Sequence, residues 1–245
     1  MPVGVELGAV VGQRRNTFTF RDAITKGLWV IINLSKGRLG ENSAVLGSLF
    51  FTKLSLDVMA ESKTPEAERK FFAIYADELQ NLAGRNFATL IAEARKFRIS
   101  VTAGHQFWHQ LSPEMRSAML GVGSRVFFRL HYHDAREMAG ELNPAERQWY
   151  TELLTRLPRG RAVFRTSAEP PVSFTVDAHK RSQSTPRQIE DLKAHARSLY
   201  ATPRDVIRQD IENRYSSQLT KDLSKLTGRK PTPPPASPKP SLPTV

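Results

Sequence analysis

The stretch FFAIYADELQNL, residues 71–82, decides the fold, because six largely apolar residues run directly into two adjacent acids, Asp77 and Glu78. A short continuous apolar run of this kind is typical of a strand that is buried on both faces. Two carboxylates at the end of such a strand either serve a function there or cap the helix that follows. The rest of the sequence bears on the choice between these two roles.

Other short apolar runs alternate with longer stretches of helical period, the pattern of a parallel sheet with crossover helices. The sequence predicts strands at residues 28–34 (LWVIINL), 71–76, 99–104 (ISVTAG) and 125–130 (RVFFRL), and an antiparallel edge pair, RAVFRT and PVSFTV, joined across Ala168-Glu169-Pro170. It predicts helices at residues 43–61, 84–98, 113–121 and 144–157, with an exposed loop at 60–70. The predicted fold is therefore α/β, with a mainly parallel sheet flanked by helices.

The composition changes after residue 180, so we expect three segments: an α/β domain at 1–180, a basic helical appendage at 181–227, and a tail at 228–245. The appendage is predicted to hold two helices, at 186–200 and 203–215. The tail has seven prolines in 18 residues and is predicted to be disordered or in polyproline II conformation.

The chain carries 36 Lys and Arg against 24 Asp and Glu, a net charge of +12, which favours a polyanionic partner such as DNA. Residues 181–245 alone carry 12 Lys and Arg against six Asp and Glu, a net charge of +6. A solvated basic face accounts for this charge, and so does an electrostatic arm that reaches toward nucleic acid or acidic lipid.

The sequence contains no cysteine, which excludes disulfides, thiolate metal sites and thiol nucleophiles and suits a cytoplasmic protein. No uninterrupted apolar run reaches the roughly 18 residues that are needed to cross a bilayer. The first residues do not begin a signal peptide. We therefore expect no membrane segment in this chain.

The polar residues at the ends of two predicted strands are the candidate site. Functional groups of a parallel sheet gather beyond the carboxyl ends of its strands. Asp77 and Glu78 follow one such end, and Gln106 follows the next, after a basic cluster that begins at Arg95. One carboxylate can hold the water shell of Mg²⁺ while its neighbour polarises a water for attack on a phosphate. The alternative is that the acids cap a helix and that Arg95 lies on a solvated helix end.

The order and spacing of these motifs carry a family resemblance. An apolar strand with Asp-Glu, a helix ending in Ala-Arg-Lys, a second strand and a Gln with Gln-Leu behind it resemble the RecA-like P-loop NTPase motor of the FtsK/HerA superfamily. More narrowly, the chain is similar to the conjugative coupling proteins of type IV secretion, the VirD4/TraD/TraG group. The resemblance covers residues 18–180, with matches at 33–37 (NLSKG), 127–129 (FFR) and 157–162 (LPRGRA).

The resemblance implies a hexameric, ATP-driven DNA pump at the cytoplasmic face of the inner membrane, with Mg²⁺ as cofactor and secretion-complex or relaxosome proteins as partners. It implies that Asp77 is the metal-side Walker B acid, that Glu78 is the catalytic base and that Gln106 is the sensor glutamine. All three would contact the nucleotide. Arg95 matches the arginine that is presented to a neighbouring subunit's nucleotide, where a guanidinium neutralises charge on the transferred phosphoryl group.

One part of the family pattern is missing from this sequence. The phosphate cradle of such a motor has the motif G-x-x-x-x-G-K-[ST]. The nearest stretches are 8–13 (GAVVGQ), which lacks the lysine, and 35–40 (SKGRLG), where the lysine precedes the glycines. We therefore expect an ATPase half that is inactive alone, either because the reading frame is truncated or split or because another chain supplies the cradle.

Two alternatives stay open on the sequence. The first is a non-catalytic module that binds nucleic acid or a partner through its basic arm and Pro-rich tail. The second is a metal hydrolase that uses four histidines, His105, His109, His131 and His133. Near these histidines, Phe107 and Trp108 either stack on the bases of single-stranded nucleic acid or pack under the sheet.

Overall fold

The computed structural model describes residues 3–79, 85–167, 170–176 and 184–227. The chain divides into two compact units, Thr17–Leu192 and a second that combines Met1–Asn16 with Lys193–Val245. The predicted tail at 228–245 lies outside the described residues, as do Ala168 and Glu169 in the predicted connection between the edge strands.

The first sheet of the larger unit is a parallel pair, β1 (Phe72–Ala76) and β2 (Ile99–Ala103). Both strands and their parallel direction are confirmed. The prediction that both faces are buried is wrong for β1, because Ile74 and Ala76 are buried whereas Tyr75, on the opposite face, is 80% exposed. Among the described residues, this sheet is therefore covered on one face only.

The second sheet is antiparallel, in the order β3 (Ser124–Phe127), β4 (Arg161–Thr166) and β5 (Val172–Thr175). The predicted edge pair is confirmed as β4 and β5. The prediction of a mainly parallel sheet is wrong, because β3 pairs antiparallel with β4 and the described strands form two separate sheets. The mixed α/β class is confirmed.

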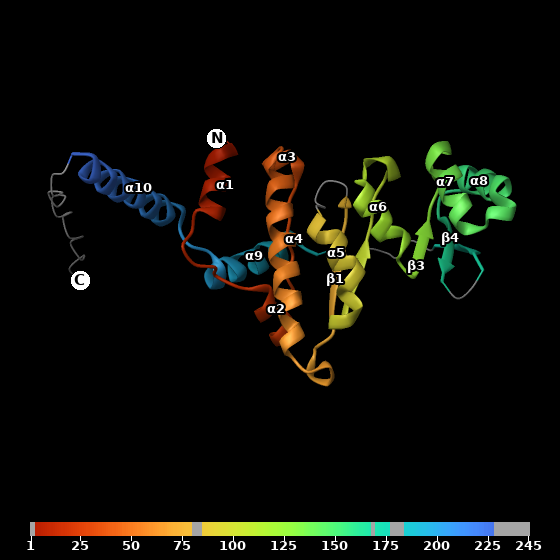
Figure 1. Ribbon diagram of the computed structural model, residues 1–245, viewed down its shortest axis with the longest axis horizontal. Coiled ribbons are helices and arrows are strands. Elements are labelled where there is room, and N and C mark those ends of the chain that lie inside the picture. The colour runs from red at the N-terminus through yellow and green to blue at the C-terminus, as the bar shows by residue number, and fades with distance from the viewer. Residues whose placement is uncertain (1–2, 80–84, 168–169, 177–183, 228–245) are drawn as a thin grey trace. The chain divides into compact units, whose positions relative to one another are not determined.

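Three helices pack in sequence beside the β1–β2 pair: α4 (Asn42–Ala60), α5 (Arg85–Glu93) and α6 (Pro113–Leu120). Figure 1 shows them in this order, and α5 contacts both of the others. Leu54 and Val58 of α4 and Phe87 of α5 are buried in the core. The predicted helix 84–98 is shorter than expected, because after α5 the chain tightens into a 3₁₀ turn, η4 (Ala94–Phe97).

A helical hairpin follows β3. It consists of α7 (Tyr132–Leu142), the 3₁₀ turn η6 (Pro144–Glu146) and α8 (Arg147–Arg156). The sequence predicted a helix at 144–157 but missed α7. The two helices pack closely, with Ala135, Ala139 and Leu154 fully buried.

The predicted strand at 28–34 is wrong. This segment is irregular and joins α2 (Phe20–Lys26) to the short helix α3 (Lys36–Leu39). Trp29 is 95% exposed and Ile31 is 80% exposed. An apolar run forms a strand only where another strand pairs with it, and none of the described strands pairs with this one, although Val30 packs against the core.

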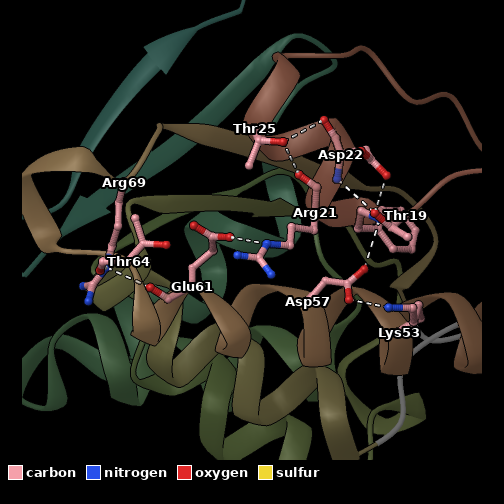
Figure 2. A network of polar contacts seen from close by, with 10 residues as sticks. Thr19, Arg21, Asp22, Thr25, Lys53, Asp57, Glu61, Thr64 and Arg69 are labelled. Atoms are coloured by element: carbon pink, nitrogen blue, oxygen red, sulfur yellow. Dashed lines mark hydrogen bonds and ion pairs between the residues drawn. The ribbon is translucent and has the colours of Figure 1, made fainter.

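Polar contacts fix α2 on α4, as Figure 2 shows. The Phe20 backbone N–H donates to Asp57 Oδ2 at 3.1 Å, and Asp57 also pairs with Lys53. Arg21 Nε lies 3.6 Å from Oε1 of the buried Glu61, which follows Asp57 by one helical turn. The predicted loop at 60–70 contains the 3₁₀ turns η1 (Glu61–Lys63) and η2 (Glu66–Glu68). Carboxylates on α4 and η1 thus serve to position α2.

The smaller unit contains α1 (Val3–Val11) and α10 (Arg204–Thr227), which pack together, and shares α9 (Pro186–Tyr200) with the larger unit. Arg214 Nη2 donates to the Gly12 carbonyl, and Arg14 pairs with Asp210 at 3.6 Å. Helix α9 agrees with the predicted helix 186–200. Helix α10 runs well past the end of the predicted helix 203–215, because its exposed polar sequence has no breaker before Gly228.

One helical segment among the described residues, Asn42–Lys63, is long and apolar enough to cross a membrane by length and composition alone. The expectation that the chain has no membrane segment stays a prediction. This test by itself is weak, because the segment also has the contacts of a core helix: Leu54 and Val58 pack in the core, and Asp57 holds α2.

Candidate functional site

The carboxyl ends of β1 and β2 emerge at the same edge of the parallel pair. Ala76 lies opposite Ala103, and the pairing continues beyond the strands. The Gly104 N–H donates to the Ala76 carbonyl at 2.8 Å, and the Leu79 N–H donates to the Gly104 carbonyl at 2.9 Å. These bonds hold the turn that contains the acid pair against the end of β2.

The two acids adopt a special backbone conformation in this turn. Glu78 has a φ of 52°, in the left-handed region that side chains other than glycine rarely adopt. The Glu78 N–H donates to Asp77 Oδ1 at 2.9 Å. This bond lies within the turn that joins β1 to Leu79, and at Leu79 the backbone takes up a 3₁₀ conformation. The left-handed conformation of Glu78 is a local constraint that directs its side chain.

The side chains of Gln106 and Glu78 meet across the edge. Gln106 Nε2 donates to Glu78 Oε1, although the two residues are 28 positions apart in the sequence. Asp77 Oδ1 lies 3.4 Å from the position that a Cβ atom would take at Gly104, so glycine there keeps the surroundings of the carboxylate open. The structure therefore places Asp77, Glu78 and Gln106 together, as the sequence predicted.

Arg95 lies elsewhere. It belongs to η4, which precedes the amino end of β2, whereas the acid pair and Gln106 lie beyond the carboxyl ends of β1 and β2. A five-residue strand spans about 16 Å, so Arg95 does not join the acid pair within one chain. The role of Arg95 at the nucleotide of a neighbouring chain stays a prediction.

The residues around Gln106 include a partly buried polar cluster that the sequence did not single out. The Trp108 backbone N–H donates to Oδ2 of the buried Asp134 at 3.0 Å, and Trp108 Nε1 donates to Glu137 Oε1 at 2.6 Å. Burial lowers the pKa of His105, whose ring lies 5.7 Å from that of Trp108, against an opposing effect of Asp134. A tryptophan with both N–H groups bonded to carboxylates has a packing role, so stacking of Trp108 on bases is not supported.

The four histidines do not form a metal centre in the described part of the chain. His131 and His133 stack with ring centroids 5.7 Å apart. Nevertheless, no group of three or more His, Asp or Glu side chains among the described residues is arranged to hold a metal ion. The metal-hydrolase alternative therefore has no geometric support. Phe107, the other aromatic residue considered for base stacking, is 40% exposed.

The carboxylates of Asp77 and Glu78 suit Mg²⁺ as ligands, but they do not by themselves hold the phosphates of a nucleotide. Mg²⁺ takes oxygen ligands, keeps several waters and is bound by one or two carboxylates together with substrate phosphates. The exposed Asp77 carboxylate, next to Glu78, has the chemistry of such a ligand. The phosphates need the backbone cradle that this sequence lacks. Asp77 and Glu78 would therefore suit the carboxylate side of a magnesium site, whereas the sequence has no phosphate-cradle motif.

Comparisons with known proteins show a likeness to solved structures but not to a protein family. No protein-family profile and no curated protein matches the sequence. Among solved structures, the chain is similar to VirB4 of Thermoanaerobacter pseudethanolicus, with 16% sequence identity and a TM-score of 0.39. The match covers 59% of this chain and 39% of that one, so the chain spans well under half of VirB4.

Proposed function

We propose that this chain supplies the acid pair and the sensor glutamine of an ATP-hydrolysing site in a DNA-translocating motor of the coupling-protein type. The phosphate cradle of that site would come from another polypeptide segment. The hydrogen bond between Gln106 and Glu78 is the observation that carries the proposal, because it joins an amide and a carboxylate at the strand edge that also holds Asp77.

Each of these residues has a distinct task in the proposed site. Asp77 would orient the water shell of Mg²⁺, which when bound neutralises phosphate charge. Glu78 would accept a proton from the attacking water, and Gln106 would orient that water or contact a phosphate oxygen. Arg95, at the opposite end of β2, would act on the site of a neighbouring chain. Activity would then depend on assembly, and a hexamer would meet that need.

Phosphate release by a completed site tests the proposal. The P-loop segment of a coupling protein is joined upstream of this chain, and turnover is measured with and without Mg²⁺ and DNA. We expect Mg²⁺-dependent, DNA-stimulated hydrolysis that falls by at least about 100-fold in Glu78→Gln, the usual loss when a general base is removed. Glu66→Gln, which changes an exposed acid in the loop before β1, is the matched control and should keep the full rate. Full turnover in Glu78→Gln would exclude Glu78 as the base.

A further inference from the structure

A cavity of about 1150 Å³ lies at the end of β2 away from the acid pair. Its walls come from α5 and η4, from α6, from the first residues of β2, and from the adjoining ends of β3 and β4. All of these elements belong to the larger unit. Three arginines line the cavity, Arg95, Arg125 and Arg165, together with four hydroxyl-bearing residues, Thr89, Ser117, Thr166 and Ser167.

The register of the second sheet places two of these arginines directly opposite each other. Arg125 of β3 pairs with Arg165 of β4, and paired residues of an antiparallel ladder project from the same face. Like charges in this arrangement destabilise a sheet. The pairing therefore works against folding unless an anion lies between or beside the two guanidinium groups.

Burial of part of Arg125 increases the free-energy cost of placing these two like charges opposite each other. Nη1 of Arg125 is buried and finds no hydrogen-bond partner among the residues that the structure describes. Burial, and then the charge of Arg165, lowers the pKa of Arg125, while Glu141 opposes that shift. A buried N–H without an acceptor costs free energy that a bound oxygen would recover. Glu114 is the one acid among the described residues that line the cavity, so it balances only part of the charge of three arginines.

We propose that this cavity binds a phosphate-bearing ligand of about nucleotide size through Arg95, Arg125 and Arg165. The planar guanidinium group donates two parallel hydrogen bonds to a phosphate, and hydroxyl groups donate to the remaining oxygens. The volume of about 1150 Å³ exceeds what a single inorganic ion needs and is slightly above the roughly 300–1,000 Å³ of typical small-molecule cavities. The phosphate belongs either to a free nucleotide or to a nucleic-acid backbone. The site does not depend on Asp77 or Glu78, which lie beyond the other end of β2.

Thermal unfolding of the full chain tests this site. Pyrophosphate and ADP serve as probes for a free phosphate ligand, and a 12-residue oligothymidylate serves as the probe for a backbone, all without Mg²⁺ and at equal ionic strength. We expect at least one probe to raise the unfolding temperature and to bind at least about tenfold more weakly to R125Q and R165Q, since each loses a charged bidentate donor. The effective probe identifies the source of the phosphate.

Two further variants separate this site from general charge and from the proposed hydrolytic site. R129Q removes an exposed arginine just beyond β3 and should bind like the wild type. Glu78→Gln should also bind like the wild type, so a failed hydrolysis test leaves this inference standing.

R165Q should melt no lower than the wild type when no phosphate is present, because it removes a repulsion. Arg95→Gln changes an exposed residue and keeps the test open if R125Q does not fold.

Three results would overturn the inference. The first is that no probe changes the unfolding temperature of the wild type. The second is that R165Q and Arg95→Gln respond to the probes as fully as the wild type. The third is that R129Q loses the response as completely as R165Q, which would indicate attraction by net charge alone.

Discussion

At the scale of the residue, the left-handed backbone of Glu78 predicts that glycine is more stable than alanine at this position, the reverse of the usual order. Replacing alanine with glycine normally destabilises a protein, but a φ of 52° penalises alanine and not glycine. We expect Glu78→Gly to be more stable than Glu78→Ala by about 1 kcal/mol, because both variants lose the bond to Gln106 and only one keeps the backbone penalty. Denaturant unfolding of the two variants measures the difference, and a less stable glycine variant would contradict the conformation.

His105 links stability to pH. Burial lowers its pKa from the ordinary value of 6.5, so below that pH the unfolded chain binds more protons than the folded chain. The contribution of His105 to the unfolding free energy is therefore complete above pH 6.5 and is lost as the pH falls. Between about pH 7.5 and pH 5.5, the wild type should lose more unfolding free energy than His105→Gln does. His195→Gln, at an exposed position of α9, should lose as much as the wild type.

At the scale of the element, the end of α2 depends on one glycine. Gly27 closes the helix in the left-handed conformation with a φ of 67°, and no atom lies within 4 Å of the position that its Cβ would take. Gly27→Ala should therefore cost about 1 kcal/mol of unfolding free energy through backbone conformation alone. Gly37→Ala in α3, where φ is not positive, should leave that free energy unchanged or raise it by up to about 1 kcal/mol. Equal losses in the two variants would exclude this explanation.

The elements also differ in how far the sequence predicts them. The pair β1–β2 and the meeting of Gln106 with Glu78 follow from apolar runs that end in polar residues and from the rule for parallel strands. The segment at 28–34 reads as a strand by the same criterion, but apolarity does not reveal whether another element covers Trp29. The opposition of Arg125 and Arg165 depends on β3–β4 register, which a one-residue slip would change. Helix α7 was missed because its first turn, Tyr-His-Asp, resembles a polar loop.

At the scale of the whole molecule, the net charge of +12 predicts how binding to nucleic acid should depend on salt. Each phosphate that is neutralised releases counterions, so the affinity for a single-stranded oligonucleotide should fall more than about tenfold between 50 and 200 mM salt if three or more phosphates are contacted. A binding module without catalysis predicts the same slope and no effect of Asp77→Ala. Affinity that is independent of salt would remove electrostatic binding of nucleic acid from either proposal.

The exposure of Trp29 affects the tryptophan fluorescence of the protein. An indole in water emits at longer wavelength than an indole in a protein core, and Trp29 is 95% exposed whereas Trp108 is only 5% exposed. The emission of the chain therefore combines distinct populations, one open to a dissolved quencher and one shielded from it. Any protein segment that covers residues 28–34 would shift the emission of Trp29 to the blue, so an unlabelled chain carries its own reporter of that event.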